Sequence, residues 1–300
     1  MASTVHFLDG ARRIVAKELR IAYRLNLHNV WVAALPPLLL AAASWVVDPP
    51  DRPGPTLMTV VIWSYLFVYI FDAANQAAGI EEDRINKPQR PAPMGLVDAH
   101  GLRTRCAVGS VLFVSIGFAA SVWTGTISAV WVATIVFVHM FMPASMYFAW
   151  KPLSNLSGAV TQLIGGWAIV GPLNTTAVTW ALTLSIMVVI AMPIEDVRDV
   201  DGDIAAGRRS YPMMFGASSV SRTFAVLMAV WPFVGWALIL RTVELTTCEF
   251  CTLAIVFTLS YSAGLSALNT RSMPSQKRAY ILYSLVHVAL TALPLATVIT

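Results

Sequence analysis

The chain has 300 residues, of which 57% are hydrophobic and 12% are charged, and its mean hydropathy is +0.68. A soluble domain carries about 25% charged residues, so the composition excludes an ordinary water-soluble globule and favours a membrane protein. The net charge of +4 does not indicate nucleic-acid binding, because the basic residues stand at predicted helix ends beside acidic ones.

The first predicted element is an amphipathic basic helix within residues 1–27. Segment 11–24 combines Arg and Lys with apolar residues and runs directly into the first apolar stretch. A mitochondrial targeting segment is the competing interpretation, since it is also basic, but Asp9 and Glu18 are atypical of one. We therefore expect a helix that lies at the cytosolic membrane interface.

Apolar stretches near the length of about 20 residues that a helix needs to cross a bilayer follow one another along the chain. They predict an all-α, polytopic membrane protein with one membrane domain over 28–300. The pattern of alternating polar and apolar residues that is typical of membrane barrels is not found. The nine predicted spans are 28–47, 57–79, 102–123, 126–148, 154–171, 176–194, 219–240, 249–268 and 280–299.

Basic residues predict the orientation of these spans. Lys and Arg concentrate in the amino-terminal segment and in every second loop, whereas the opposite loops hold Arg52 and Arg241 alone. Because Lys and Arg in short loops favour the cytosolic side, we expect cytosolic cap loops at 80–101 and 195–218. The carboxyl terminus would lie across the membrane, and in a eukaryotic cell that membrane would be the endoplasmic reticulum.

Two acidic clusters stand at the cytosolic ends of the second and sixth predicted spans. Helical spacing places most of the acidic residues of each cluster on one helical face. Glu81 and Asp201 point away from that face and are expected to be ordinary solvated charges. The candidate catalytic and metal-binding residues are Asn75, Glu82 and Asp83 in the first cluster and Asp196, Asp199 and Asp203 in the second.

Two carboxylate faces that meet at a membrane edge repel each other unless cations join them. Oxygen ligands suit Mg²⁺, which binds through a few carboxylates together with phosphate oxygens. Lys87, Arg90, Arg198 and Arg209 lie close by in sequence, and such groups take up the remaining phosphate charge. The alternative is that both clusters are solvated loop charges, but charged groups at membrane depth favour a functional site.

Both clusters resemble motifs of a known family. Asn75 to Asp83, followed by Asn86-Lys87-Pro88-Gln89-Arg90-Pro91, resembles the first motif of the UbiA superfamily of intramembrane prenyltransferases. Asp196-x-x-Asp199-x-x-x-Asp203 with Ala206-Gly207-Arg208-Arg209-Ser210 resembles its second. The resemblance covers nearly the whole chain and implies a bundle of nine helices around a central cavity. It also implies two or three Mg²⁺ ions and diphosphate contacts for Arg24, Tyr147 and Lys151.

One departure from the family pattern narrows the expected activity. Prenyltransferases of the family usually carry Asp where this chain has Gly79, and Glu82 is the candidate replacement. The variant resembles the UbiA-type terpene cyclases of fungi. This resemblance implies ionisation of a prenyl diphosphate, farnesyl diphosphate above all, and its cyclisation to a sesquiterpene within the bilayer. A membrane prenyltransferase with an aromatic or lipid acceptor is the alternative, a transporter is a third, and no obligate protein partner is indicated.

Aromatic and small residues inside the spans leave two interpretations open. Trp63, Phe71 and Tyr283 can face a carbocation or pack between helices, and His287 can accept a proton or serve as a core residue. The glycines of the fifth span allow close helix contact or leave room for a prenyl tail.

Overall fold

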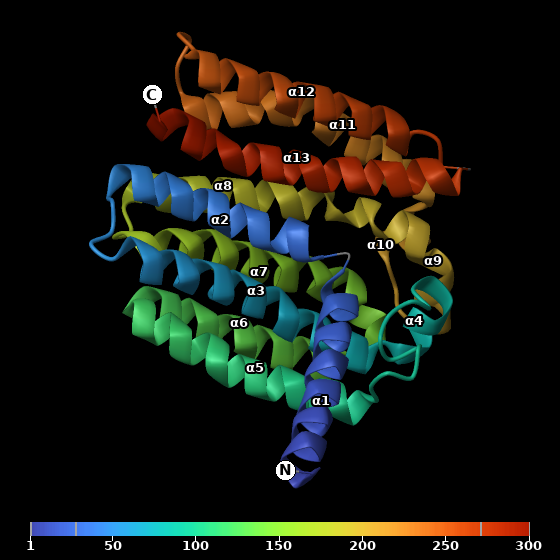
Figure 1. The fold of residues 1–300 in the computed structure, drawn as a ribbon. Coiled ribbons are helices and arrows are strands. Elements are labelled where there is room, and N and C mark those ends of the chain that lie inside the picture. The colour runs from blue at the N-terminus through green and yellow to red at the C-terminus, as the bar shows by residue number, and fades with distance from the viewer. Residues whose placement is uncertain (1, 28, 271, 300) are drawn as a thin grey trace.

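Long helices lie side by side through the structure, a computed structural model that describes residues 2–27, 29–270 and 272–299, with side chains from Arg12 onward. No strand occurs in the described residues, as predicted. The end residues of the predicted segments 1–27 and 28–300, namely residues 1, 28 and 300, lie outside the described residues. The long helices of the bundle (Figure 1) are α2 (Val30–Val47), α3 (Pro53–Ala78), α5 (Ala99–Ala120), α6 (Val122–Phe141), α7 (Tyr147–Val170), α8 (Thr175–Ala191), α11 (Ala217–Gly235), α12 (Thr247–Ala267) and α13 (Met273–Ile299).

Eight helices of the described residues are long and apolar enough to cross a membrane, where the sequence predicted nine spans. The difference is α7, which has 24 residues but is not among the eight. Its first turns carry Lys151 and Asn155, and its interior carries Gln162. The protein is therefore an integral membrane protein, and a ninth span at α7 stays a prediction.

The boundary between α6 and α7 differs from the predicted one. The predicted span 126–148 placed Tyr147 at its end, but α6 ends at Phe141, and Pro143 and the 3₁₀ turn η1 (Ala144–Met146) follow. Proline cannot continue a helix, so the chain turns here and Tyr147 begins α7. Because Tyr147 and Lys151 are four residues apart on one helix, they share a face.

Three short helices gather at one end of the bundle (Figure 1). They are α4 (Ile80–Asn86), α9 (Asp196–Ala205) and α10 (Tyr211–Phe215). The predicted cap segments 80–101 and 195–218 thus contain helices. Gly79 separates α3 from α4, so the single helical face predicted for Asn75, Glu82 and Asp83 is wrong, because it required one continuous helix.

Aromatic side chains fill the core between α3, α5, α6 and α7. Trp63 stacks on Phe113 with ring centroids 5.0 Å apart, and Phe67 stacks on Trp131 at 4.8 Å. A Cβ on Gly165 would overlap the Trp63 ring. Here the glycines of α7 allow close helix contact, and these rings pack as core residues.

The amino-terminal helix α1 (Ala2–Asn26) runs steeply across the bundle axis (Figure 1). Ile14 and Leu19 are exposed on it, while Glu18 pairs with Arg105 of α5 at 2.5 Å. An exposed amphipathic helix pinned to the bundle agrees with a position at the membrane interface, which stays a prediction.

Candidate active site

The two acidic clusters meet where α4 crosses α9. Lys87 Nζ lies 3.6 Å from Asp199 Oδ2, and the amide of Asn86 donates to the Asp199 carbonyl at 3.5 Å. A Cβ on Gly202 would overlap the Asn86 side-chain amide. Glycine at position 202 therefore lets the two short helices approach closely enough to join both clusters.

Arg90 and Asp83 form a buried ion pair beside this crossing. Arg90 Nη1 lies 2.7 Å from Asp83 Oδ1, and the two side chains are 6% and 2% exposed. A second carboxylate, Asp72 of α3, is fully buried nearby and accepts from Asn29 Nδ2 at 2.6 Å. Since a buried charge is costly unless it is paired, Arg90 balances negative charge from the end of α3 and from α4.

Arg208 joins the two clusters directly. Its guanidinium contacts the Glu82 carboxylate of α4 and lies 3.7 Å from Asp203 Oδ1 of α9. It also lies over the Tyr147 ring, 4.8 Å from the centroid. An Arg between two carboxylates and an aromatic face is held in one orientation, which leaves its other donors available to an anion.

Lys151 and Arg198 surround the start of α9. Lys151 Nζ contacts Asp196 and lies 3.2 Å from Glu195 Oε2. Arg198 lies 3.5 Å from Glu195 Oε1, 3.7 Å from Asp199 Oδ1 and 3.8 Å above the Tyr280 ring centroid. These two cations therefore border the second cluster on its α7 and α13 sides.

Burial shifts the pKa of three site carboxyls in one direction. It raises the pKa of Asp83 and of Asp196 in spite of their basic partners. The pKa of Asp203 rises to about 6, through burial and then through repulsion from Asp196. The basic partners thus do not fully offset the cost of burying these three carboxylates in their charged form, and an added cation would lower that cost.

Glu195 behaves in the opposite way. Burial opposes its charged form, but Lys151 and then Arg198 outweigh that effect and lower its pKa to about 2. Its charge is already satisfied, so Glu195 serves as the counterion of the two cations.

Buried carboxylate oxygens without a hydrogen-bond partner bear on whether the site suits a metal ion. Asp72, Asp83 and Asp203 each have one buried oxygen without a hydrogen-bond partner among the described residues. An unmet buried acceptor is costly, and oxygen-only donors suit Mg²⁺, which takes one or two carboxylates and completes its shell with phosphate oxygens and water. No three acidic, His or Cys side chains of the described ranges are gathered to hold a metal ion alone, so a fitting ion would share its ligands with an anion.

The structure separates the predicted site residues into two groups. Those that it brings together are Glu82, Asp83, Lys87, Arg90, Tyr147, Lys151, Asp196, Arg198, Asp199 and Asp203. Asn75 precedes the break at Gly79 and is half-buried. Arg24 reaches the Gln89 carbonyl and Met94 Sδ instead, and Arg209 is exposed with its guanidinium 5.8 Å from the Phe148 ring centroid.

Three residues of the site were missed by the sequence analysis: Asp72, Glu195 and Arg208. Asp72 had a signal, because an Asp inside an apolar span is functional by default. Glu195 directly precedes Asp196 in the sequence, but helical spacing did not mark Glu195 as a site residue. Helical spacing does not apply to Arg208, because Gly207 turns the chain just before it with φ +64°.

A bundle of membrane-length helices with buried, cation-paired carboxylates at one end defines an integral membrane protein with a polar site at that end of the bundle. The chain belongs to the UbiA prenyltransferase family, whose sequence profile matches residues 31–287. Membership accords with the resemblance of the two acidic motifs.

Relatives of this chain are named as synthases, as a cyclase and as a polyprenyl transferase. Somaliensene A/B synthase of Streptomyces somaliensis is 32% identical over 68% of each chain. Diterpene cyclase eriG of Hericium erinaceus is 27% identical over 72% of each chain. A digeranylgeranylglyceryl phosphate synthase of Methanoculleus marisnigri is 29% identical over 70% of this chain and 75% of that one.

Solved structures share the fold at low sequence identity. A digeranylgeranylglyceryl phosphate synthase structure superposes with a TM-score of 0.65 at 17% identity, covering 94% of this chain and 99% of that chain. A UbiA homolog from Archaeoglobus fulgidus, bound to GPP and Mg²⁺, superposes with a TM-score of 0.60 at 15% identity, covering 93% and 99%. The helical bundle is therefore the UbiA fold.

Proposed function

We propose that this chain ionises farnesyl diphosphate and cyclises the resulting allylic cation to a sesquiterpene. The C–O bond of the diphosphate ester breaks, a distal alkene of the same chain attacks the cation, and loss of a proton ends the reaction. The observation that carries the proposal is the meeting of α4 and α9, where Lys87, Lys151 and Arg208 contact carboxylates of the two clusters. Asp203, beside Arg208, also has a buried oxygen without a hydrogen-bond partner.

The side chains would divide the work by charge. Lys87, Lys151 and Arg208 would bind the diphosphate oxygens and stabilise the leaving group. Asp83 and Asp203, which have free oxygens, would hold two or three Mg²⁺ ions together with the other acidic residues of the two clusters. Bound Mg²⁺ supplies Lewis-acid charge to the departing diphosphate, and one of the fold relatives binds GPP and Mg²⁺.

Cyclisation is favoured over transfer by two independent features. Two of the relatives that match about 70% of this chain are named a somaliensene synthase and a diterpene cyclase. Gly79 also stands where the family's transferases usually carry Asp. A Cβ at position 79 would lie 3.5 Å from Arg208 Nη2.

A membrane prenyltransferase is the second candidate, because one relative is named a polyprenyl transferase and another a digeranylgeranylglyceryl phosphate synthase. One assay separates the two. Membranes that contain the protein are supplied with Mg²⁺ and farnesyl diphosphate but no acceptor, and volatile hydrocarbon and released diphosphate are measured. Cyclic hydrocarbon supports the cyclase, whereas turnover that requires an aromatic or lipid acceptor supports the transferase.

Matched variants connect that activity to the site. Asp199→Asn removes a carboxylate that Lys87 and Arg198 contact, and we expect turnover to fall by a factor of about 100 or more, as for loss of one transition-state contact. Asp201→Asn on the same helix changes an exposed carboxylate and should leave turnover unchanged. Equal activity of the two variants would contradict the proposed site.

We also propose that the site faces the cytosol, in the endoplasmic reticulum of a eukaryotic host, as the Lys and Arg distribution favours. A glycosylation acceptor added after the carboxyl terminus should be modified in microsomes. The same acceptor placed before the amino terminus should not be modified, and the reverse result would invert the orientation.

A further inference from the structure

Helix α1 carries an apolar stripe that the described part of the bundle leaves exposed. Val15, Leu19 and Tyr23 recur at every fourth residue and therefore share one face of the helix. Leu19 and Tyr23 are 66% and 65% exposed. A row of large apolar side chains that the rest of the protein leaves uncovered marks a surface on which another molecule docks.

A basic stripe runs along α1 beside the apolar one. It consists of residues at the spacing i, i+4, i+7 and i+11, which share a second face of the helix, namely Arg13, Lys17, Arg20 and Arg24. The side chains of Arg13, Lys17 and Arg20 are exposed. Glu18 does not neutralise this stripe, because it lies on another face and pairs with Arg105 of α5 at 2.5 Å. The outer side of α1 is therefore apolar along one line and positively charged along the next.

The third face of α1 fixes the helix to the bundle. Ile21 and Leu25 are buried on this face, and the Leu25 carbonyl accepts from Gln76 Nε2 of α3 at 2.9 Å. At the end of the basic stripe, Arg24 Nη1 donates to the Gln89 carbonyl at 3.4 Å. Because these contacts hold α1 along one side, its apolar stripe and its exposed basic residues point away from the protein.

The direction of α1 in the fold suits a helix that lies at the membrane interface. It runs steeply across the long helices (Figure 1), and eight helices of the described residues are long and apolar enough to cross a membrane. A helix that crosses membrane-spanning helices at a steep angle lies along the plane of the bilayer. In that plane an apolar face inserts among acyl chains while a neighbouring basic face meets the lipid headgroups.

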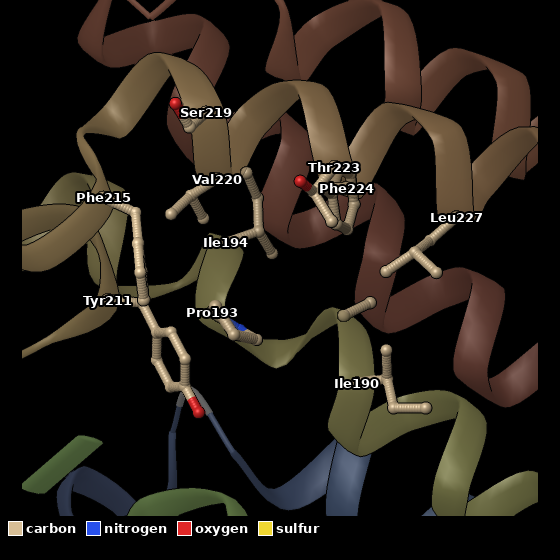
Figure 2. A pocket seen from close by; sticks show the side chains of 11 residues that line it. Ile190, Pro193, Ile194, Tyr211, Phe215, Ser219, Val220, Thr223, Phe224 and Leu227 are labelled. Atoms are coloured by element: carbon tan, nitrogen blue, oxygen red, sulfur yellow. The ribbon is translucent and has the colours of Figure 1, made fainter. Parts of the chain in front are cut away.

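The charge on α1 distinguishes it from another exposed apolar surface of the bundle. An apolar cavity of about 350 Å³ lies between the end of α8 and the start of α11. Figure 2 shows Ile190, Val220 and Leu227 among its walls, and no charged side chain of the described residues lines it. The acyl chains of any lipid suffice to cover such a surface, whereas the basic stripe of α1 requires negative charge beside the acyl chains.

We propose that α1 is a docking surface for the anionic phospholipids of the bilayer leaflet beside it. The apolar stripe lies among their acyl chains, and Arg13, Lys17 and Arg20 bind their phosphate and carboxylate groups. A second copy of the chain is a poorer match, since a symmetric contact would place one basic stripe against the other. The inference goes beyond the proposed function and does not depend on turnover.

Photo-crosslinking identifies the lipid that lies against α1. The full-length protein with Tyr23→p-benzoylphenylalanine is placed in nanodiscs of equal parts phosphatidylcholine and phosphatidylserine and irradiated, and its adducts are identified by mass spectrometry. We expect phosphatidylserine adducts to exceed phosphatidylcholine adducts about fivefold, the factor for one basic side chain near an anionic leaflet. The matched control is Ile190→p-benzoylphenylalanine, at an exposed position of α8 beside the uncharged cavity, which should give the two adducts in equal amounts.

Charge variants of the crosslinking protein test the basic stripe. Three positive charges are removed from α1 in Arg13→Gln/Lys17→Gln/Arg20→Gln, and the excess of phosphatidylserine at position 23 should disappear while lipid labelling there continues. The same charge is removed from exposed residues of α11 and α13 in the control Arg222→Gln/Lys277→Gln/Arg278→Gln, which should keep the excess. Equal adducts of the two lipids at position 23 without these charge changes overturn the inference. A crosslink to a second copy in place of lipid also overturns it, and so does an excess that survives in the α1 charge variant.

Discussion

The buried pair of Arg90 and Asp83 offers a quantitative test of the site's electrostatics. At their N–O distance of 2.7 Å, two unit charges attract by about 6 kcal/mol for an effective dielectric constant of about 20. Desolvation of both groups offsets much of that attraction. Removal of one partner, however, leaves the other charge buried and unpaired, which costs roughly 3–5 kcal/mol.

Arg90→Met should therefore destabilise the folded protein by about that amount. For a chain of this size we expect Tm to fall by roughly 6–10 °C, at about 2 °C per kcal/mol. Thermal unfolding of the purified protein in mild detergent, followed by tryptophan fluorescence, measures the shift. Arg84→Met is the matched control, because Arg84 and Glu81 pair at 2.8 Å but are 61% and 78% exposed, and an exposed pair contributes less than about 1 kcal/mol.

A double variant separates the two possible causes of the lost stability, which are an unpaired buried charge and lost packing of the Arg90 side chain. In Asp83→Asn/Arg90→Met the unpaired charge at position 83 is removed as well, so we expect much of the lost stability to return. If Arg90→Met unfolds within a degree of Arg84→Met, the pair is not the stabilising contact inferred here. If the double variant is as unstable as Arg90→Met, the loss comes from packing of the Arg90 side chain and not from charge.

Three further expectations concern the same end of the bundle. Gly202→Ala should lower turnover at least tenfold, since even a 1 Å misplacement of catalytic groups can cost far more. Asn86→Ala in the same chain should restore turnover, because it removes the side-chain amide that the new Cβ would meet. No recovery would mean that this contact does not set the distance between α4 and α9. Arg208→Lys should raise KM for the diphosphate roughly tenfold or more, because Lys cannot reproduce the contacts to Glu82 and a phosphate together, while Arg222→Lys, which changes an exposed residue of α11, should not. Inorganic diphosphate with Mg²⁺ at about 100 times Kd should stabilise the protein by about 2.7 kcal/mol, and EDTA should abolish the rise in Tm.

The fold was largely predictable from apolar length, because each spanning helix must satisfy its backbone within its own segment. Spacing within the second cluster was equally informative. Asp196, Asp199 and Asp203 share one unbroken helix, α9, so the i, i+3, i+7 rule describes them. Asp201 is exposed on the same helix, as that spacing predicted, and Glu81 is also exposed, on α4.

Spacing failed where the helix did not continue. Gly79 ends α3 with φ −111° and ψ 31°, and α4 restarts with its own direction (Figure 1). Likewise, the choice of Arg209 over Arg208 as the inward cation depended on a turn at Gly207. A turn has no fixed residue period, so sequence spacing could not tell which of two adjacent Arg side chains enters the site.

The side chains around Gly79 explain why glycine, and not Asp, stands at this position. A Cβ at this position would lie 3.2 Å from Glu82 Oε2 and 3.5 Å from Arg208 Nη2. A larger acidic side chain there would bring a second anion against Glu82 and compete for the same guanidinium. The chain instead supplies its carboxylate from α4, and that carboxylate is bound by Arg208 from beyond α9. The loss of one acidic residue and the direct coupling of the two clusters through Arg208 are therefore parts of one arrangement.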